Sequence, residues 1–184
     1  MKENKTIDRK SVILVDENDK AIGIASKEEA HKRPLLHRAF SIFLYDGDKM
    51  LLQQRAFHKY HSGGLWANAC CSHPGDNLCI TRDAEERLYA ETGIECGVQE
   101  IFSFVYNYQF NVDLFEHEYD HVMIGEYKNG QKSEIKPNPD EVASIRWVSF
   151  TQLQKELKET PEKFAPWFNI AAPKVIEYLT QKED

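Results

Sequence analysis

The chain has few of the features expected of a nucleic-acid-binding, membrane-spanning or secreted protein. Its 184 residues carry 23 Lys and Arg against 30 Asp and Glu, a net charge of −7. A broad basic surface for nucleic acid is therefore not expected, although a local basic pocket for an anionic small molecule remains compatible with this charge. No segment approaches the 18 consecutive apolar residues of a membrane span. The start of the sequence, MKENKTIDRK, lacks the apolar run of a signal peptide.

Cysteine is also scarce. The four cysteines are Cys70, Cys71, Cys79 and Cys96, and no pair has the C-x-x-C spacing of a structural zinc site. The adjacent Cys70 and Cys71 could form a disulfide with each other only under strain. We therefore expect free thiols, a reducing compartment and a cytoplasmic protein.

Strand patterns dominate the middle of the chain, which contains neither an internal repeat nor a low-complexity linker. The length predicts a single domain over residues 1–184, with residues 1–10 flexible. Residues 27–40 are mixed in pattern and are interrupted at Pro34. Turns are expected at 16–20, 46–48 and 129–130, and strands at 11–26 (a pair), 35–56 (a hairpin), 66–72, 98–110, 117–127 and 143–150.

Helix signals lie at 77–93, 150–158 and 166–180. In the first, Ile80, Ala84 and Leu88 form an apolar stripe, and Gly93 occupies the usual position of a helix C-cap glycine. Helices scattered among strands are typical of the α+β class. We expect an α/β sandwich in which helices flank a mixed sheet.

A pair of carboxylates lies in the strand pattern at Glu116-His117-Glu118. Alternate residues of a strand share a face, so Glu116 and Glu118 point one way and His117 the other. Adjacent carboxylates repel each other unless a cation or a proton lies between them. The pattern fits either a solvated face or a cation site.

Three histidines could complete such a cation site. His31 and His37 lie on either side of Pro34, and His73 follows the cysteine pair. Three imidazoles and two carboxylates make a suitable octahedral set for Mn²⁺, Mg²⁺ or a related ion. A single histidine is more often a structural or surface residue than a metal ligand, so convergence of these residues is a hypothesis.

The helix around Arg87 suggests a diphosphate site. Asp83, Arg87 and Glu91 form a charged stripe, which fits either i,i+4 ion pairing or binding of an anion by Arg87 and of a metal by Glu91. Residues 90–94, AETGI, resemble the end of the Nudix box, G-x5-E-x7-R-E-U-x-E-E-x-G-U, where U is a bulky apolar residue. The Arg-Glu pair of that motif is reversed at Glu86-Arg87, and one of its glutamates is Ala90. The missing carboxylates argue against hydrolysis, whereas a diphosphate could still be bound.

Several segments together resemble one family, the type 1 isopentenyl-diphosphate isomerases, which are Nudix-fold enzymes of isoprenoid biosynthesis. These segments are LLHRAFS (35–41), LLQQRA (51–56), GLWANACCSHP (64–74), the degenerate Nudix helix, EHE (116–118) and FAPWF (164–168).

The resemblance implies specific roles. The metal ligands would be His31, His37, His73, Glu116 and Glu118, binding Mn²⁺, Mg²⁺ or Zn²⁺, with a second Mg²⁺ between the substrate diphosphate, Glu91 and the carbonyl of Cys71. Proton transfer would involve Cys71 and Glu118, assisted by Tyr106 or the nearby Tyr108, with Trp167 over the reacting carbons. The diphosphate would contact Lys27, Arg55, Lys59 and Arg87. The implied partner is a small diphosphate substrate, and the chain would be a monomer or weak homodimer.

The strand pattern distinguishes the two adjacent cysteines. In an extended segment Cys71 shares a face with His73, and Cys70 points the other way. If His73 binds a metal, Cys71 faces the same pocket. Two alternatives to the isomerase stay open: a Nudix-type diphosphohydrolase and a non-catalytic metal- or diphosphate-binding module.

Overall fold

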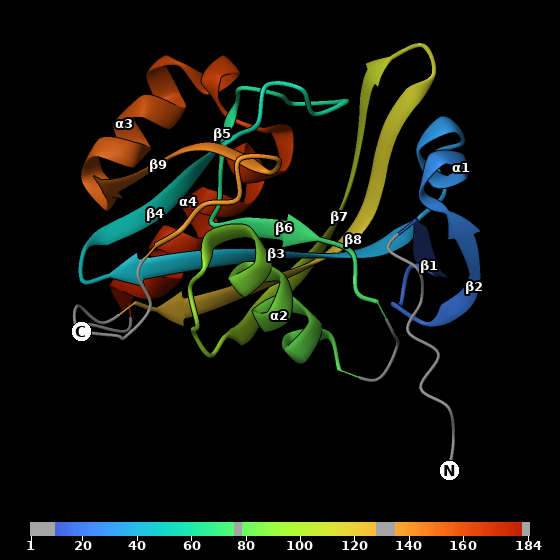
Figure 1. The fold of residues 1–184 in the computed structure, drawn as a ribbon, viewed down its shortest axis with the longest axis horizontal. Helices are drawn as coiled ribbons and strands as arrows, with labels where there is room; N and C mark the ends of the chain where they lie inside the picture. Colours follow the sequence, from blue (N-terminus) through green and yellow to red (C-terminus); the bar gives the residue numbers. More distant parts are fainter. Residues whose placement is uncertain (1–9, 76–78, 128–134, 182–184) are drawn as a thin grey trace.

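The computed structural model describes residues 10–75, 79–127 and 135–181 (Figure 1). The expected turn at 129–130 and most of the segment expected to be flexible, residues 1–9, lie outside these ranges. In the described residues the order of elements is β1 (Ser11–Val15), β2 (Ala21–Ser26), α1 (Lys27–Lys32), β3 (His37–Asp46), β4 (Lys49–Arg55), β5 (Trp66–Ala67), β6 (Cys70–Ser72), α2 (Ile80–Thr92), β7 (Gln99–Asn111), β8 (Leu114–Glu126), β9 (Val142–Ser149), α3 (Phe150–Glu159), a 3-10 turn (Pro161–Lys163) and α4 (Pro166–Gln181).

Strand β3 organises the mixed sheet. Along one side it pairs in parallel with β8, which pairs antiparallel with β7. Its other side pairs with β1 at its start, β6 in its middle and β4 at its end. Strand β4 then diverges to pair with β5 and β9. The sheet is therefore strongly curled around β3, and the long β7–β8 hairpin extends beyond it beside α1 (Figure 1).

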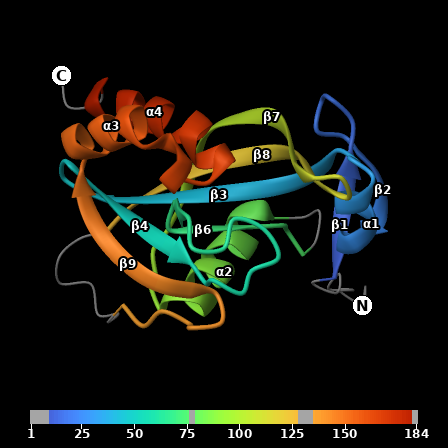
Figure 2. The same cartoon turned by 90° about the horizontal axis from the view of Figure 1, so that it is seen from above.

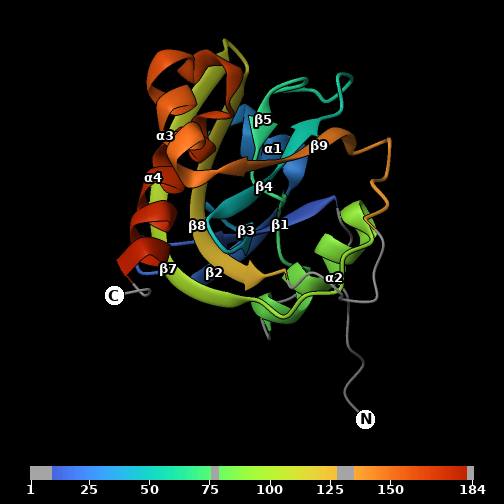
Figure 3. The ribbon, with the colours of Figure 1, turned by 90° about the vertical axis from the view of Figure 1, so that its left-hand side faces the viewer.

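Helices cover both faces of this sheet. Helices α3 and α4 lie on one side of β3 and α2 lies on the other (Figure 2), and α4 lies against the β7–β8 hairpin (Figure 3). Side chains of β3 alternate between the two layers, since Phe43 packs with Phe168 of α4 whereas Ile42 packs with Leu88 of α2. Both faces of β3 are buried, which explains its nearly continuous apolar sequence.

The predicted α+β class with a mixed sheet between helices is confirmed. The expected hairpin is β3–β4, and the predicted helix at 77–93 is α2 within the described residues, since residues 77 and 78 lie outside them. Gly93 ends α2 with a φ of 73°, and its N–H donates to the carbonyl of Tyr89 at 2.8 Å. A positive φ is the conformation in which glycine is favoured over other residues.

Two local features differ from the sequence expectations. Residues 27–32 form a short helix, which has no apolar period but is capped by Ser26, whose hydroxyl accepts from the N–H of Glu29 at 3.1 Å. The expected strand at 66–72 is two strands, because the chain leaves β4 after Ala67 and joins β3 at Cys70. Among the described residues, no helix combines the length and the hydropathy needed to cross a bilayer.

Candidate metal centre and active site

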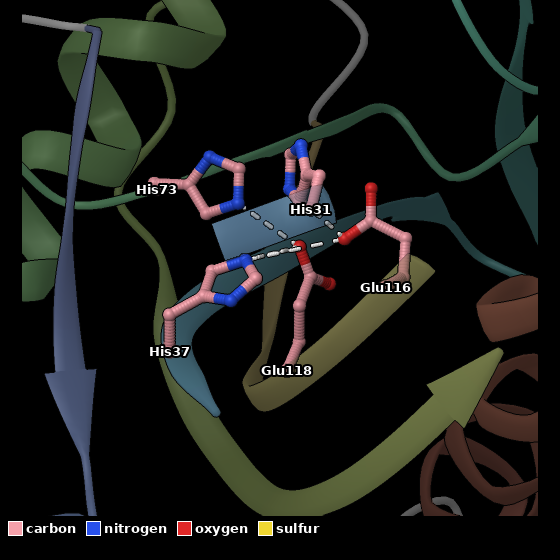
Figure 4. Close-up of side chains that lie close together, drawn as sticks. All are labelled: His31, His37, His73, Glu116 and Glu118. Carbon is pink, nitrogen blue, oxygen red and sulfur yellow. Dashed lines mark hydrogen bonds and ion pairs between the residues drawn. The ribbon is translucent and has the colours of Figure 1, made fainter. Parts of the chain in front are cut away.

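Five side chains from four parts of the chain converge on one point (Figure 4). Each offers one ligand atom, and these atoms lie within 4.8 Å of one another. His31 comes from α1, His37 from the first residue of β3, His73 from the segment after β6, and Glu116 and Glu118 from β8.

Sheet register explains much of this convergence. The parallel pairing of β3 and β8 places His37 directly opposite Glu118. Alternation along β8 brings Glu116 to the same face as Glu118 and turns His117 away. The Nδ1 atom of His117 instead lies 2.8 Å from the carbonyl of Pro34.

The donor atoms of this cluster suit a divalent cation. The Nδ1 of His37 lies 2.8 Å from the carbonyl of Leu35, a contact that requires Nδ1 to carry the proton and leaves a lone pair on Nε2. The buried Nε2 atoms of His31 and His37 and Oε2 of Glu116 have no hydrogen-bond partner within the described parts of the chain. Buried atoms of this kind are costly unless a ligand satisfies them. The cluster can therefore hold a metal ion.

The two carboxylates differ in their neighbours. Oε1 of Glu118 lies 3.0 Å from Nε2 of His73 and 3.7 Å from Nε2 of His37. Burial alone would raise the pKa of Glu118, but the nearby imidazoles of His37 and His73 lower it well below the ordinary value. Glu118 is therefore held as a carboxylate, the form that binds cations.

The adjacent thiols lie on opposite faces of β6. Cys70 is fully buried in the cluster of Ala84 and Leu88 under α2. Cys71 instead lines a pocket that also contains His73 and Glu118. Burial raises the pKa of Cys71 to about 12, so that its thiol keeps the proton at neutral pH.

Of the two candidate tyrosines, Tyr106 is the one that contacts Glu118. Its hydroxyl donates to Oε2 of Glu118 at 2.6 Å. Tyr106 is almost fully buried, whereas Tyr108 is 44% exposed. Burial and the nearby carboxylates raise the pKa of Tyr106 well above its ordinary value, which keeps its hydroxyl a hydrogen-bond donor.

Trp167, in the first turn of α4, forms part of the same pocket. The guanidinium of Arg55 lies 5.2 Å from the centre of its ring, within the range of a cation–π contact. The Nη1 atom of Arg55 also lies 3.6 Å from Sγ of Cys71. Arg55 thus lies between the indole and the thiol.

The four basic residues predicted to contact a diphosphate all line this pocket, and they are Lys27, Arg55, Lys59 and Arg87. Arg87 is paired with Glu91 at 2.6 Å and with Glu141 at 2.9 Å, and Lys59 also pairs with Glu141. Glu91 lines the pocket but does not belong to the five-residue cluster. All four predicted basic residues therefore line the pocket, and two of them, Lys59 and Arg87, are already paired with carboxylates.

Sequence reasoning missed three residues of the site. Oε1 of Glu116 lies 2.8 Å from Nε2 of His61, and the hydroxyl of Tyr60 lies 3.0 Å from Nδ1 of His31. Glu141 lies in the loop before β9 and had no signal of its own. Only the unusual content of the loop HKYHSGG, with aromatic and histidine side chains before paired glycines, could have drawn attention to Tyr60 and His61.

Comparison with known proteins agrees with this architecture. A family model described as NUDIX domain matches residues 35–168. Isopentenyl-diphosphate Delta-isomerase 2 of Aromatoleum aromaticum is 44% identical over 168 residues, which cover 90% of this chain and 86% of that protein. The isopentenyl-diphosphate Delta-isomerase of Photobacterium profundum is 44% identical over 174 residues, covering 91% and 93%.

Solved structures share the fold at low identity. DR0079 from Deinococcus radiodurans matches with a TM-score of 0.65 at 14% identity, covering 82% of this chain and 90% of that one. The MutT protein from Methanosarcina mazei Go1 matches with a TM-score of 0.58 at 14% identity, covering 79% and 95%. From the family model and the curated relatives together, the chain belongs to the Nudix superfamily and, within it, to the isopentenyl-diphosphate Delta-isomerases.

Proposed function

We propose that this chain interconverts isopentenyl diphosphate and dimethylallyl diphosphate, in keeping with the names of its relatives. The observation that carries the proposal is one pocket that combines a half-buried thiol, a carboxylate bonded to a tyrosine, an indole and four basic side chains. These are the groups needed to move a proton along a carbon skeleton that is anchored by its diphosphate. The proposed location is the cytoplasm, which suits four free cysteines. The proposed state is a monomer or weak homodimer that binds neither nucleic acid nor membrane.

The isomerisation is a balanced proton shift. A proton adds to C4 of the alkene, a tertiary carbocation forms at C3, and a proton leaves C2. Cys71 and Glu118 would serve as the two proton-transfer groups, one on either side of the substrate: one gives its proton to C4 and the other takes the proton that leaves C2. A proton passed between the two groups, or exchanged with solvent, would return both to their starting state. The hydroxyl of Tyr106, 2.6 Å from Oε2 of Glu118, would orient that carboxylate and relay its proton.

The pocket also offers stabilisation for the cation. The face of Trp167 is electron-rich and already attracts the guanidinium of Arg55, whose carbon lies 5.2 Å from the ring centre. Once Arg55 turns to the diphosphate, the same face would be available to the carbocation. Trp167 is itself almost fully buried, so a cation over its face would lie away from bulk water, which would otherwise trap the cation as an alcohol.

The metal assignment belongs to this proposal. His31, His37, His73, Glu116 and Glu118 would bind one Mn²⁺, Mg²⁺ or Zn²⁺ ion. Such an ion would fix the orientation of Glu118 and alter its basicity. A second Mg²⁺ would accompany the substrate diphosphate, with Glu91 and the carbonyl of Cys71 as its protein ligands.

Diphosphate binding would exchange one set of ion pairs for another. Lys59 and Arg87 would leave Glu141 for phosphate oxygens, and Lys27 and Arg55 would complete the contacts. Release of Glu91 from Arg87 would at the same time free its carboxylate for the second Mg²⁺. The proposal thus explains why Lys59 and Arg87 are paired with carboxylates inside the pocket.

The deciding assay incubates the protein with isopentenyl diphosphate, Mg²⁺ and Mn²⁺ and measures acid-labile dimethylallyl diphosphate. Turnover supports the proposal, and its absence with both metals supplied contradicts it. Phosphate release from a panel of nucleoside diphosphates would instead favour a diphosphohydrolase. Binding of the diphosphate with no turnover of either kind would indicate a non-catalytic module.

A further inference from the structure

One buried amide connects two parts of the site that lie far apart in the sequence. Asn68 is fully buried between β5 and β6, and its side chain makes three hydrogen bonds. Its Oδ1 accepts from Nε1 of Trp167 at 3.0 Å. Its Nδ2 donates to the carbonyls of Ile42 at 3.2 Å and Cys70 at 2.6 Å.

Chemistry fixes the orientation of this amide. The indole Nε1–H of Trp167 can only donate, so the oxygen of Asn68 must face it. The carbonyls of Ile42 and Cys70 can only accept, so the nitrogen must face them. Rotating the amide by 180° would oppose donor to donor and acceptor to acceptors. The side chain therefore has a single stable orientation, which other residue types do not reproduce.

Each contact of Asn68 restrains a group beside the proposed catalytic residues. The bond to the carbonyl of Cys70 holds the residue before Cys71, and the bond to Ile42 ties that point of β6 to β3. The bond to Trp167 fixes rotation of an indole that would otherwise be held only by packing. The hydrogen bond at Nε1 restrains the orientation of the indole ring of Trp167. The guanidinium carbon of Arg55 lies over the face of this ring, 5.2 Å from its centre.

We infer that Asn68 is a positioning residue, which fixes the distance and orientation between the thiol of Cys71 and the face of Trp167. The inference rests on the proposed isomerase function. A carbocation is stabilised by an indole only over its face, and proton transfer requires a fixed donor. Loss of Asn68 should therefore impair the chemical step more than binding of the diphosphate, which contacts other residues.

The test compares Asn68→Ala and Trp167→Phe, singly and together. The Phe variant keeps an aromatic face but has no N–H for Asn68 to bind. We expect Asn68→Ala to lower kcat by roughly 10- to 100-fold with KM changed by less than about 3-fold, as the loss of two or three hydrogen bonds predicts. The fold-loss of kcat caused by Asn68→Ala should be smaller in the Trp167→Phe background, because the hydrogen bond between residues 68 and 167 is already absent there.

Asn169 offers a matched control. Its amide also donates to backbone carbonyls near the start of α4, at 3.0 Å to Pro161 and 3.4 Å to Phe164, but it does not line the pocket. Asn169→Ala should keep kcat and KM. Equal kcat losses in Asn68→Ala and Asn169→Ala would assign Asn68 a general structural role and overturn the inference, as would an effect that is unchanged in the Trp167→Phe background.

A spectroscopic measurement separates this inference from the proposed function. In ¹⁵N spectra, the indole N–H signal of Trp167, assigned by its loss in Trp167→Phe, should move upfield and exchange faster with solvent in Asn68→Ala. The signals of Trp66 and Trp147 should stay in place and report an intact fold.

An unmoved Trp167 signal would overturn the inference even if the wild type isomerises its substrate. Wild-type inactivity would contradict the function alone, since the signal still reports the contact. Should Asn68→Ala not fold, an undiminished kcat in Trp167→Phe would overturn the inference by itself.

Discussion

Cys70 and Cys71 are neighbours in the chain, and their thiols lie on opposite faces of β6. Cys70 packs under α2 among apolar side chains, whereas Cys71 lines the pocket with His73. Backbone alternation alone therefore places the thiol of Cys70 in the core and the thiol of Cys71 in the pocket that contains His73.

Substitution of each cysteine by serine should separate the two roles. Cys71→Ser should lose most turnover, by more than about 100-fold, because a hydroxyl is a poor replacement for a thiol in proton transfer. Cys70→Ser should keep turnover but lose about 1–2 kcal/mol of stability, because it places a more polar group among Ala84 and Leu88, beside the carboxylate of Glu91. Steady-state kinetics and urea unfolding check both. Similar kinetic losses in the two variants would contradict the assignment.

The two neighbouring tyrosines provide a second matched pair. Tyr106→Phe removes the 2.6 Å hydrogen bond to Glu118, and kcat should fall by roughly 10- to 100-fold. Tyr108→Phe removes a hydroxyl from a side chain that is 44% exposed and should leave kcat within about 2-fold. Steady-state measurement of kcat for both variants tests whether Tyr106 is the assisting tyrosine. A larger loss for Tyr108→Phe would mean that the proton relay follows another route.

Metal binding should stabilise the fold through the His and Glu cluster. A divalent ion at 100 times its Kd should add about 2.7 kcal/mol to the free energy of unfolding. Thermal melts of the EDTA-treated protein with added Mn²⁺ should show this gain. It should be abolished in His37→Ala and preserved in His117→Ala, because His117 faces away from the cluster. An equal Mn²⁺ response in these two variants would exclude the cluster as the binding site.

Stability should depend on pH through Glu156, which does not line the pocket. The guanidinium of Arg146 donates to both of its oxygens, at 3.2 and 2.6 Å, and these hydrogen bonds lower the pKa of Glu156. Because the folded pKa lies below the unfolded one, the pair contributes stability above the unfolded pKa and loses it as pH falls through the folded pKa. Solvent screening limits the contribution to about 0.5 kcal/mol.

Glu156→Gln should therefore be less stable than the wild type at pH 7, and the difference should shrink as pH falls below 4.5, the ordinary value for glutamate. Urea unfolding at pH 7 and near pH 3.5 measures it. A difference that grew toward low pH would have the wrong sign for this mechanism.

The sequence predicted those parts of the fold that repeat at a regular spacing. The period-2 pattern of β8 separated Glu116 from His117, and the apolar stripe of α2 ended at Gly93 as expected. Helix α1 was missed because six residues carry less than two turns of periodicity, and its stability comes from the Ser26 cap and from packing of Ala30. The break between β5 and β6 depends on which strand each pairs with, and local sequence does not encode that choice.

The candidate site likewise contains residues that were predicted from the sequence and residues that were not. Family resemblance named the five cluster residues, and the structure brings them together. His61 and Glu141 carried no local pattern, because each contacts the site from a loop. Long-range placement of loop residues depends on the whole fold, so sequence periodicity cannot predict it.

The register between β3 and β8 also affects the order in which the protein can assemble. His37 meets Glu118 only when these two strands pair in parallel, and they are separated by β4, β5, β6, α2 and β7 in the chain. Closing so long a loop costs conformational entropy before the contacts between the two strands can offset it. We therefore expect the five-residue cluster to form late in refolding, so that capture of a metal ion would report the closure of the central sheet.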